Sequence, residues 1–358
     1  MSVACVELNG SIVLNNGTTV TRAWLTDELT TGAPAGNPTQ TLTGFFFPGL
    51  VDAHCHIGLD AQGATSDHAA RQQAHATWHS GVTLVRDAGS PRDTRFLDGE
   101  PNTPSIIRAG RHIARPRRYI RHFAWELDDP QQLPAAIEAQ AKAGDGWVKI
   151  VADWIDRSTG QLAPLWTRRQ LVEGIARAHD LGARVTAHTF STAALDDLFD
   201  AGIDGIEHGT GMTADHMARA ADAAVPVTPT LLQVGRFSQI ADQGHRYPLF
   251  ARQMRAMGER RYDHVAHMVE AGVKLLVGTD AGGTIEHGRI ADECAELVAA
   301  GVPAPRVMDA ATWQARAFLA AAPRAARLPA AVVGYENDPR RDITELHRPR
   351  HIVAPWRG

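Results

Sequence analysis

Two histidines stand at the end of an apolar run near the start of the chain, in the stretch GFFFPGLVDAHCHIGLD (residues 44–60). Alternate side chains of an extended strand share a face, so His54 and His56 point the same way and Cys55 points the other way. Two imidazoles on one face at a strand end are suited to bind a divalent metal ion. The other interpretation is a pair of solvated histidines at a turn, and the rest of the chain has to distinguish the two.

Four more residues that could bind metal or move protons lie in or just after short apolar runs. They are Lys149 in GWVKIV, His188 in RVTAHTF, His208 in GIEHGTG and Asp280 in KLLVGTDAGG. Each run follows an amphipathic segment and a Gly, and this order predicts repeated βαβ units and a parallel sheet.

We count eight candidate strands, beginning near Leu50, Val82, Ser105, Trp147, Arg184, Gly205, Val225 and Lys274. Eight strands fit a (β/α)8 TIM barrel better than an open doubly wound sheet, and no G-x-G-x-x-G motif follows the first strand. Chemistry in such barrels lies at the C-terminal ends of the strands. All six residues fall there, and this coincidence favours the metal site over solvated histidines.

The segments between the strands carry helix signals. Thr167 and Gln170 have the spacing of a capping box at the start of TRRQLVEGIARAHDLG. A Gly follows the end of each predicted helix, where a left-handed residue is preferred. These glycines are Gly81, Gly144, Gly182, Gly202 and Gly272.

The two ends of the chain differ from the middle and read as short strands and turns. We predict that residues 1–46 and 326–358 pair into one small β-sandwich domain, and that residues 47–325 form the barrel. The stretch AAPRAARLPA marks the second boundary.

Composition excludes several classes of protein. The 358 residues include 36 basic and 40 acidic side chains, and this net charge of -4 argues against a nucleic-acid partner. No apolar stretch approaches the ~18 residues that span a membrane, and the N-terminus has no signal-peptide pattern. Three scattered cysteines predict reduced thiols. We expect a cytoplasmic protein that acts on a small molecule, and the sequence leaves both a monomer and a homo-oligomer open.

The motifs PGLVDAHCH, WVKIV, VTAHTF, GIEHGTG and VGTDAGG, in this order and spacing, resemble the amidohydrolase superfamily of metal-dependent hydrolases. The nearest branch groups imidazolonepropionase-related hydrolases with prolidase-like dipeptidases. The resemblance implies that His54 and His56 bind one metal ion, that His188 and His208 bind a second, and that Asp280 binds metal and shuttles protons. It also implies that CO2 converts Lys149 into a carbamate that bridges two divalent ions, most simply Zn2+.

The resemblance implies hydrolysis of an amide-type C–N bond, in a dipeptide or an N-acyl amino acid, by a hydroxide held between the two ions. A cyclic amidase, a lactonase and a mononuclear deaminase are alternatives; in the last, Lys149 is an ordinary lysine and His208 contacts substrate. A catalytically silent binding protein is a further alternative, but such a protein is expected to lack at least one ligand. Asp280 could instead cap a helix.

The chain departs from the family after the third strand. Relatives carry Gly-Gly-His there, whereas this chain reads RPRRYIRH, which makes Tyr119 and His122 the candidates for the role of that histidine. The same region is rich in arginine, and Arg115, Arg117 and Arg118 are candidates to bind a substrate carboxylate. Alternatively, these arginines face solvent or pair with the acidic residues of WELDD.

Overall fold

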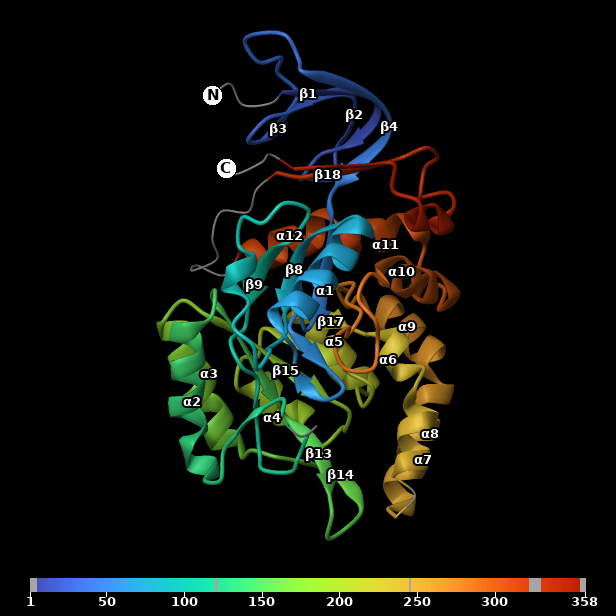
Figure 1. Cartoon of the computed structure of the whole chain (residues 1–358). Helices are drawn as coiled ribbons and strands as arrows, with labels where there is room; N and C mark the ends of the chain where they lie inside the picture. The colour runs from blue at the N-terminus through green and yellow to red at the C-terminus, as the bar shows by residue number, and fades with distance from the viewer. Residues whose placement is uncertain (1–4, 120–121, 245, 322–329, 355–358) are drawn as a thin grey trace.

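The computed structural model describes residues 5–119, 122–244, 246–321 and 330–354. Short parallel strands form its centre, and helices lie around them (Figure 1). The parallel strands are β5 (Leu50–Cys55), β8 (Val82–Asp87), β9 (Ser105–Arg108), β10 (Ile113–Ala114), β11 (Trp125–Glu126), β12 (Trp147–Val151), β15 (Arg184–Thr189), β16 (Gly205–His208) and β17 (Val227–Thr228). Six of the predicted strands begin at the predicted residue, and β17 begins two residues later than expected, after Pro226.

The parallel strands belong to two sheets, ordered β5-β8-β9 and β11-β10-β12-β15-β16-β17. The predicted eighth strand is not a regular strand, and the backbone at its end turns to φ 55° at Asp280. Its segment nevertheless bonds to both neighbours: Leu276 N donates to Val227 O (2.9 Å), and Ala53 N donates to Val277 O (2.8 Å). The segment therefore lies between the first and seventh strands, as a TIM-barrel-type α/β fold requires.

Helices connect most of the strands, and most of their buried residues recur at helical spacing. They are α1 (Asp67–His79), α2 (Leu133–Ala143), α3 (Arg168–Asp180), α4 (Leu195–Asp200), α5 (Ala214–Asp222), α6 (Leu231–Val234), α7 (Phe237–Gln243), α8 (Pro248–Glu259), α9 (Arg261–Glu270), α10 (Ile290–Ala299), α11 (Ala304–Ala311) and α12 (Trp313–Ala320). Within the described ranges, no helix has the length and apolar character needed to cross a membrane.

Helix ends follow the local signals with one exception. The capping box of α3 is present, with Thr167 Oγ1 accepting from Gln170 N. Four of the five predicted glycines are left-handed, with φ between 71° and 89°. The prediction for Gly144 is wrong: its backbone is extended, and the left-handed residue is Gly146. Close packing requires glycine there, because a Cβ on Gly144 would lie 2.8 Å from Arg108 O.

The two ends of the chain meet in one sheet at the end of the molecule opposite the β13–β14 hairpin (Asp153–Asp156 and Gln161–Pro164) (Figure 1). Its strand order is β19-β18-β4-β1-β2-β3. The bounds are Val6–Val13 (β1), Thr19–Leu25 (β2), Leu29–Thr30 (β3), Gln40–Pro48 (β4), Val332–Tyr335 (β18) and His351–Val353 (β19). No second terminal sheet occurs among the described residues, so the sandwich stays a prediction. The second domain boundary lies mostly outside the described residues.

Candidate metal centre

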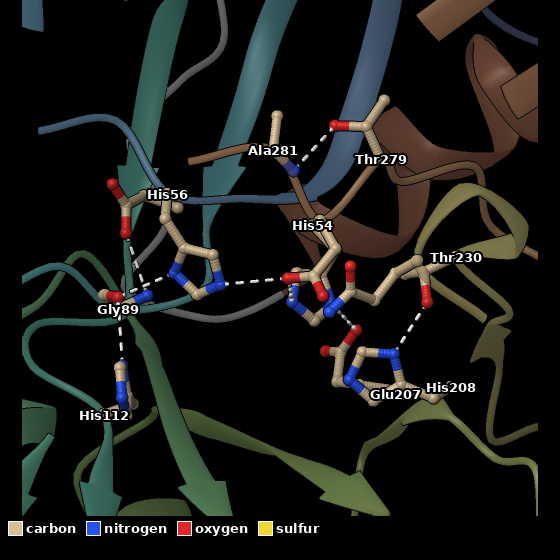
Figure 2. Close-up of polar contacts among 12 residues, drawn as sticks. His54, His56, Gly89, His112, Glu207, His208, Thr230, Thr279 and Ala281 are labelled. Carbon is tan, nitrogen blue, oxygen red and sulfur yellow. Dashed lines mark hydrogen bonds and ion pairs between the residues drawn. The ribbon is translucent and has the colours of Figure 1, made fainter. Parts of the chain in front are cut away.

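His54 and His56 lie at the C-terminal end of β5, and strand alternation turns both rings to the interior (Figure 2). Asp280 reaches the same place from the eighth segment, because its N–H donates to His54 O (2.7 Å). Its Oδ1 lies 3.1 Å from His54 Nε2 and 3.3 Å from His56 Nε2. One carboxylate oxygen therefore faces two imidazole nitrogens.

His208 completes a compact group with His54 and Asp280. One ligand atom from each of these three residues lies within 4.8 Å of the other two. His208 has φ 65°, a left-handed conformation that is uncommon for non-glycine residues. Because of this turn, Glu207 and His208 both have buried side chains at the centre, although neighbouring strand residues normally alternate (Figure 2).

Glu207 fixes the orientation of the His54 ring. Its Oε2 lies 2.5 Å from His54 Nδ1, and its Oε1 contacts Arg86, which is also buried. Burial alone would raise the pKa of Glu207, but Arg86, His54 and Lys149 hold it well below its usual range. An ionised carboxylate only accepts, so His54 carries its proton on Nδ1 and presents the Nε2 lone pair to the centre.

The ring of His56 is fixed in the same way by a backbone carbonyl. Gly89 O lies 2.8 Å from His56 Nδ1 and 3.1 Å from His112 Nδ1. A carbonyl oxygen only accepts, so both rings donate from Nδ1 and keep a lone pair on Nε2. Gly89 is required here because its φ is 104° and a Cβ would lie 2.6 Å from His112 N.

His188 extends the group from the end of β15. Both of its ring nitrogens are buried and have no hydrogen-bond partner among the described residues. Its ring centroid lies 4.7 Å from that of His208 and 5.3 Å from that of Tyr119. Buried polar groups without partners are rare and are a frequent sign of a missing ion or water.

Lys149 lies on β12, and the residue is only 3% exposed. Desolvation lowers the pKa of this amine to about 8, against the opposing effects of Glu207 and Asp280. Its charge also contributes to lowering the pKa of both His188 and His208, which places it beside the same group. A lysine with this lowered pKa is still mostly charged at pH 7, but its neutral fraction is much larger than that of an exposed lysine.

Sequence reasoning missed His112. The structure places its buried ring 6.0 Å from His56 and 5.2 Å from Tyr119, centroid to centroid, with Nε2 unpartnered. It follows the third strand in AGRHIA, so the rule that found the other strand-end residues could have found it. Of the two candidates after the third strand, Tyr119 lies beside His112, whereas His122 is exposed.

The arginines after the third strand bond mainly to protein oxygens. Arg115 donates to the carbonyls of Leu127 (2.9 Å) and Asp128 (2.7 Å). Arg118 donates to Ile155 O (2.6 Å) and lies 3.4 Å from Asp156. Arg117 is exposed; its backbone N–H donates to Glu126, one of the acidic residues of WELDD. Arg115 and Arg118 thus bond to structural partners, which favours the alternative interpretation of this loop.

The donor set fits a divalent cation. With both Nδ1 protons donated to Glu207 and Gly89, the free Nε2 lone pairs of His54 and His56 face an Asp280 oxygen, which also carries lone pairs. These atoms repel one another unless both rings gain a second proton or a cation lies between them. Imidazole nitrogen and carboxylate oxygen are the ligands that zinc and similar ions take.

Comparison with known proteins identifies the family. The sequence profile of the Amidohydrolase family matches residues 45–325. The chain belongs to the amidohydrolase family. This confirms the resemblance found in the five motifs and makes the protein a member of a superfamily of metal-dependent hydrolases.

Relatives of this amidohydrolase cover almost all of its length. An uncharacterized protein of Mycobacterium tuberculosis (strain ATCC 25618 / H37Rv) is 48% identical over 340 residues, 95% of this chain and 92% of that one. A Xaa-Pro dipeptidase with bound methionine superposes with a TM-score of 0.81 at 20% identity, covering 98% of both chains. A. niger ochratoxinase superposes with a TM-score of 0.81 at 18% identity, covering 99% of this chain and 95% of that one. These similarities demonstrate a shared fold.

Proposed function

We propose that this amidohydrolase cleaves an amide-type C–N bond in a small molecule such as a dipeptide or an N-acyl amino acid. The observation that carries the proposal is the meeting of the Nε2 atoms of His54 and His56 at one oxygen of Asp280, at 3.1 and 3.3 Å. The hydrogen bonds from Nδ1 of His54 and His56 leave both Nε2 lone pairs pointing to the centre. We further propose the division into a barrel (47–325) and a terminal β-domain.

The proposed centre holds two divalent ions, most simply Zn2+. The residues that would hold them are His54, His56, Lys149, His188, His208 and Asp280. The neutral amine of Lys149 would add to the carbon of CO2 and lose a proton, which converts a cation into an anionic carbamate. An ammonium cannot bind a metal ion, so this conversion is what allows Lys149 to take part.

When bound, the ions supply a water of lowered pKa and polarise the substrate carbonyl. Asp280 accepts the proton of the attacking water and passes it to the leaving nitrogen. Tyr119 keeps its proton, because burial and then Asp280 raise the pKa of its hydroxyl well above the usual value, so it can donate to the substrate. His112 is neutral, because burial and His56 hold its pKa well below the usual range, and its Nε2 can accept. A donor and an acceptor side by side are complementary to an amide group.

A mononuclear deaminase-type centre is the second candidate. The ligand atoms of His54, His208 and Asp280 lie within 4.8 Å of one another, and in the described part of the chain no hydrogen bond joins Lys149 to these three residues. In this alternative Lys149 remains an amine, and one ion is bound.

The test is a substrate screen with zinc-loaded protein and parallel elemental analysis. Dipeptides, N-acyl amino acids, lactams, lactones and aminated heterocycles are offered under the same conditions, with Asp280→Asn as the matched control. We expect two ions per chain and turnover of an amide substrate by the unmodified protein. One ion with turnover only of an aminated heterocycle selects the deaminase, and no metal and no turnover overturn both.

A further inference from the structure

A buried glutamate outside the proposed metal centre has no role in the chemistry described so far. Glu293 lies on α10 with its side chain 0% exposed. Its Oε1 accepts from Leu231 N (2.6 Å), and its Oε2 accepts from Leu232 N (2.9 Å). Burial raises the pKa of this carboxyl to about 8, although the two N–H groups lower it. A carboxyl group placed at such a cost in solvation is expected to have a structural or functional task.

The two N–H groups belong to the first turn of α6, a helix of only four residues. The residue before it, Thr230, has φ 48° and ψ 56°. This left-handed conformation is a strained one for a β-branched residue and persists only where the surroundings impose it. The two residues after Thr230, Leu231 and Leu232, donate their N–H groups to Glu293, which lies 62 residues after Leu231 in the sequence. These two hydrogen bonds fix the turn.

The Thr230 hydroxyl contacts a proposed metal ligand (Figure 2). It donates its single proton to Pro229 O (2.8 Å). It can therefore only accept from His208 Nδ1, which lies 2.6 Å away. His208 then carries its proton on Nδ1 and presents the Nε2 lone pair to the centre.

We propose that Glu293 is a positioning residue for His208, acting through the strained turn at Thr230. Glu293 fixes Leu231 and Leu232, this turn places the Thr230 hydroxyl, and the hydroxyl selects the tautomer and the angle of the imidazole. The inference rests on the proposed function, because it assumes that His208 Nε2 binds a metal ion. Such outer partners typically change metal affinity 10- to 100-fold when they are removed.

The experiment compares four single variants and one double variant with the unmodified protein. Glu293→Gln keeps the shape but turns an amide NH2 towards one of the two N–H groups, and Thr230→Val removes the hydroxyl at nearly constant shape. Thr230→Ser retains a hydroxyl and is the conservative control. Glu296→Gln is the matched control on the same helix, because Glu296 binds the side chains of Tyr262 and Arg261 rather than the turn.

Two readouts are used: the affinity for Zn2+ in competition with a chelator, and the 15N chemical shifts of the histidine rings in the metal-free protein. We expect Glu293→Gln and Thr230→Val to weaken the binding of at least one ion by about 10-fold or more. We also expect both to shift the His208 ring signals towards a tautomer mixture. Thr230→Ser and Glu296→Gln should leave both readouts close to those of the unmodified protein.

The double variant Glu293→Gln/Thr230→Val should bind metal no more weakly than the poorer single variant, because both changes act through one contact. Fully additive losses, or an unchanged affinity and tautomer in Glu293→Gln, would overturn the inference. If the unmodified protein itself binds no metal, it is the proposed function that fails. The two failures are therefore distinguishable.

Discussion

Asp280 carries a mostly buried carboxylate that lies beside several histidines of the proposed centre. Burial alone would raise its pKa, but where the rings of His54, His56 and His208 are protonated, their charges and hydrogen bonds hold the pKa well below the usual range. A lowered pKa keeps the carboxylate ionised and able to accept a proton, and it makes the protonated form a strong acid that releases the proton readily to a leaving group.

We predict that Asp280→Asn keeps the fold and much of the bound metal but loses turnover by roughly 100- to 10,000-fold, the usual size of general acid–base catalysis. The amide can occupy the same space but cannot carry the proton. The measurements are kcat on the substrate found in the screen, metal content and circular dichroism. Full activity in this variant would show that the proton passes through another group.

Lys149 is the second residue whose chemistry can be isolated by substitution. We predict that Lys149→Ala lowers the metal content and that short carboxylic acids restore part of it, because their carboxylates replace the carbamate. The control is Lys142→Ala, which removes an exposed lysine of α2 that pairs with Glu138. Metal content is measured with and without added acetate or propionate. Unchanged metal content in Lys149→Ala would select the mononuclear alternative.

At the scale of the elements, side chains that connect neighbouring strands fix the strand ends. Asp153, the first residue of the β13–β14 hairpin, accepts from Phe190 N (3.0 Å) and Ser191 N (2.8 Å), just after His188. The end of the fourth strand is thereby bound to the end of the fifth. The next residue, Trp154, lies against His188, with ring centroids 5.6 Å apart.

A second connection, between α3 and the residue before β16, gives a pH-dependent prediction. His179 of α3 bonds to Asp204 Oδ2 (2.8 Å), and this hydrogen bond raises the pKa of the imidazole. A raised pKa means that the folded state holds the proton more tightly than the unfolded state. The contribution is therefore complete below the unfolded pKa of about 6.5, and it is lost as the pH rises through the folded pKa.

We expect His179→Gln to be less stable than the unmodified protein at pH 5, with the difference shrinking by pH 9. The side chain is 41% exposed, so we expect a difference below about 1 kcal/mol. The measurement is the free energy of unfolding in urea across this range. A difference that grows with pH would contradict the assignment.

At the scale of the whole molecule, the proposed ligands come from the first, fourth, fifth, sixth and eighth strand segments. Bound ions would therefore connect parts of the chain that are far apart in sequence, and the unfolded chain would not present these ligands together. Binding that is specific to the folded state stabilises it.

We predict that removing the metal with a chelator lowers the melting temperature and that Zn2+ restores it. At a free ion concentration of 100 times Kd, each site stabilises the fold by about 2.7 kcal/mol. Calorimetry of the metal-free and metal-loaded forms measures the shift, and His54→Ala should reduce it. Equal melting temperatures, together with no metal in the purified protein, would contradict the metal centre.

The sequence by itself determined what depends on neighbours along the chain. Strand alternation placed His54 and His56 on one face, the Thr167–Gln170 spacing formed the cap, and glycines marked most helix ends. These features follow from backbone geometry and side-chain periodicity over a few residues. Together with the strand count, they predicted a TIM-barrel-type fold, whereas the family was predicted from the resemblance of five motifs.

Only the tertiary structure decided which side chains meet. Strand alternation predicts that the side chains of Glu207 and His208 point to opposite faces. A left-handed φ at His208 brings both to the centre instead, and the sequence does not predict it, because position 208 is not a glycine. The structure also placed His112 in the group instead of His122, and it connected Glu293 to a turn 62 residues away. Such contacts depend on which strands and helices become neighbours, and hydrogen bonds between distant residues leave no periodic pattern in the sequence.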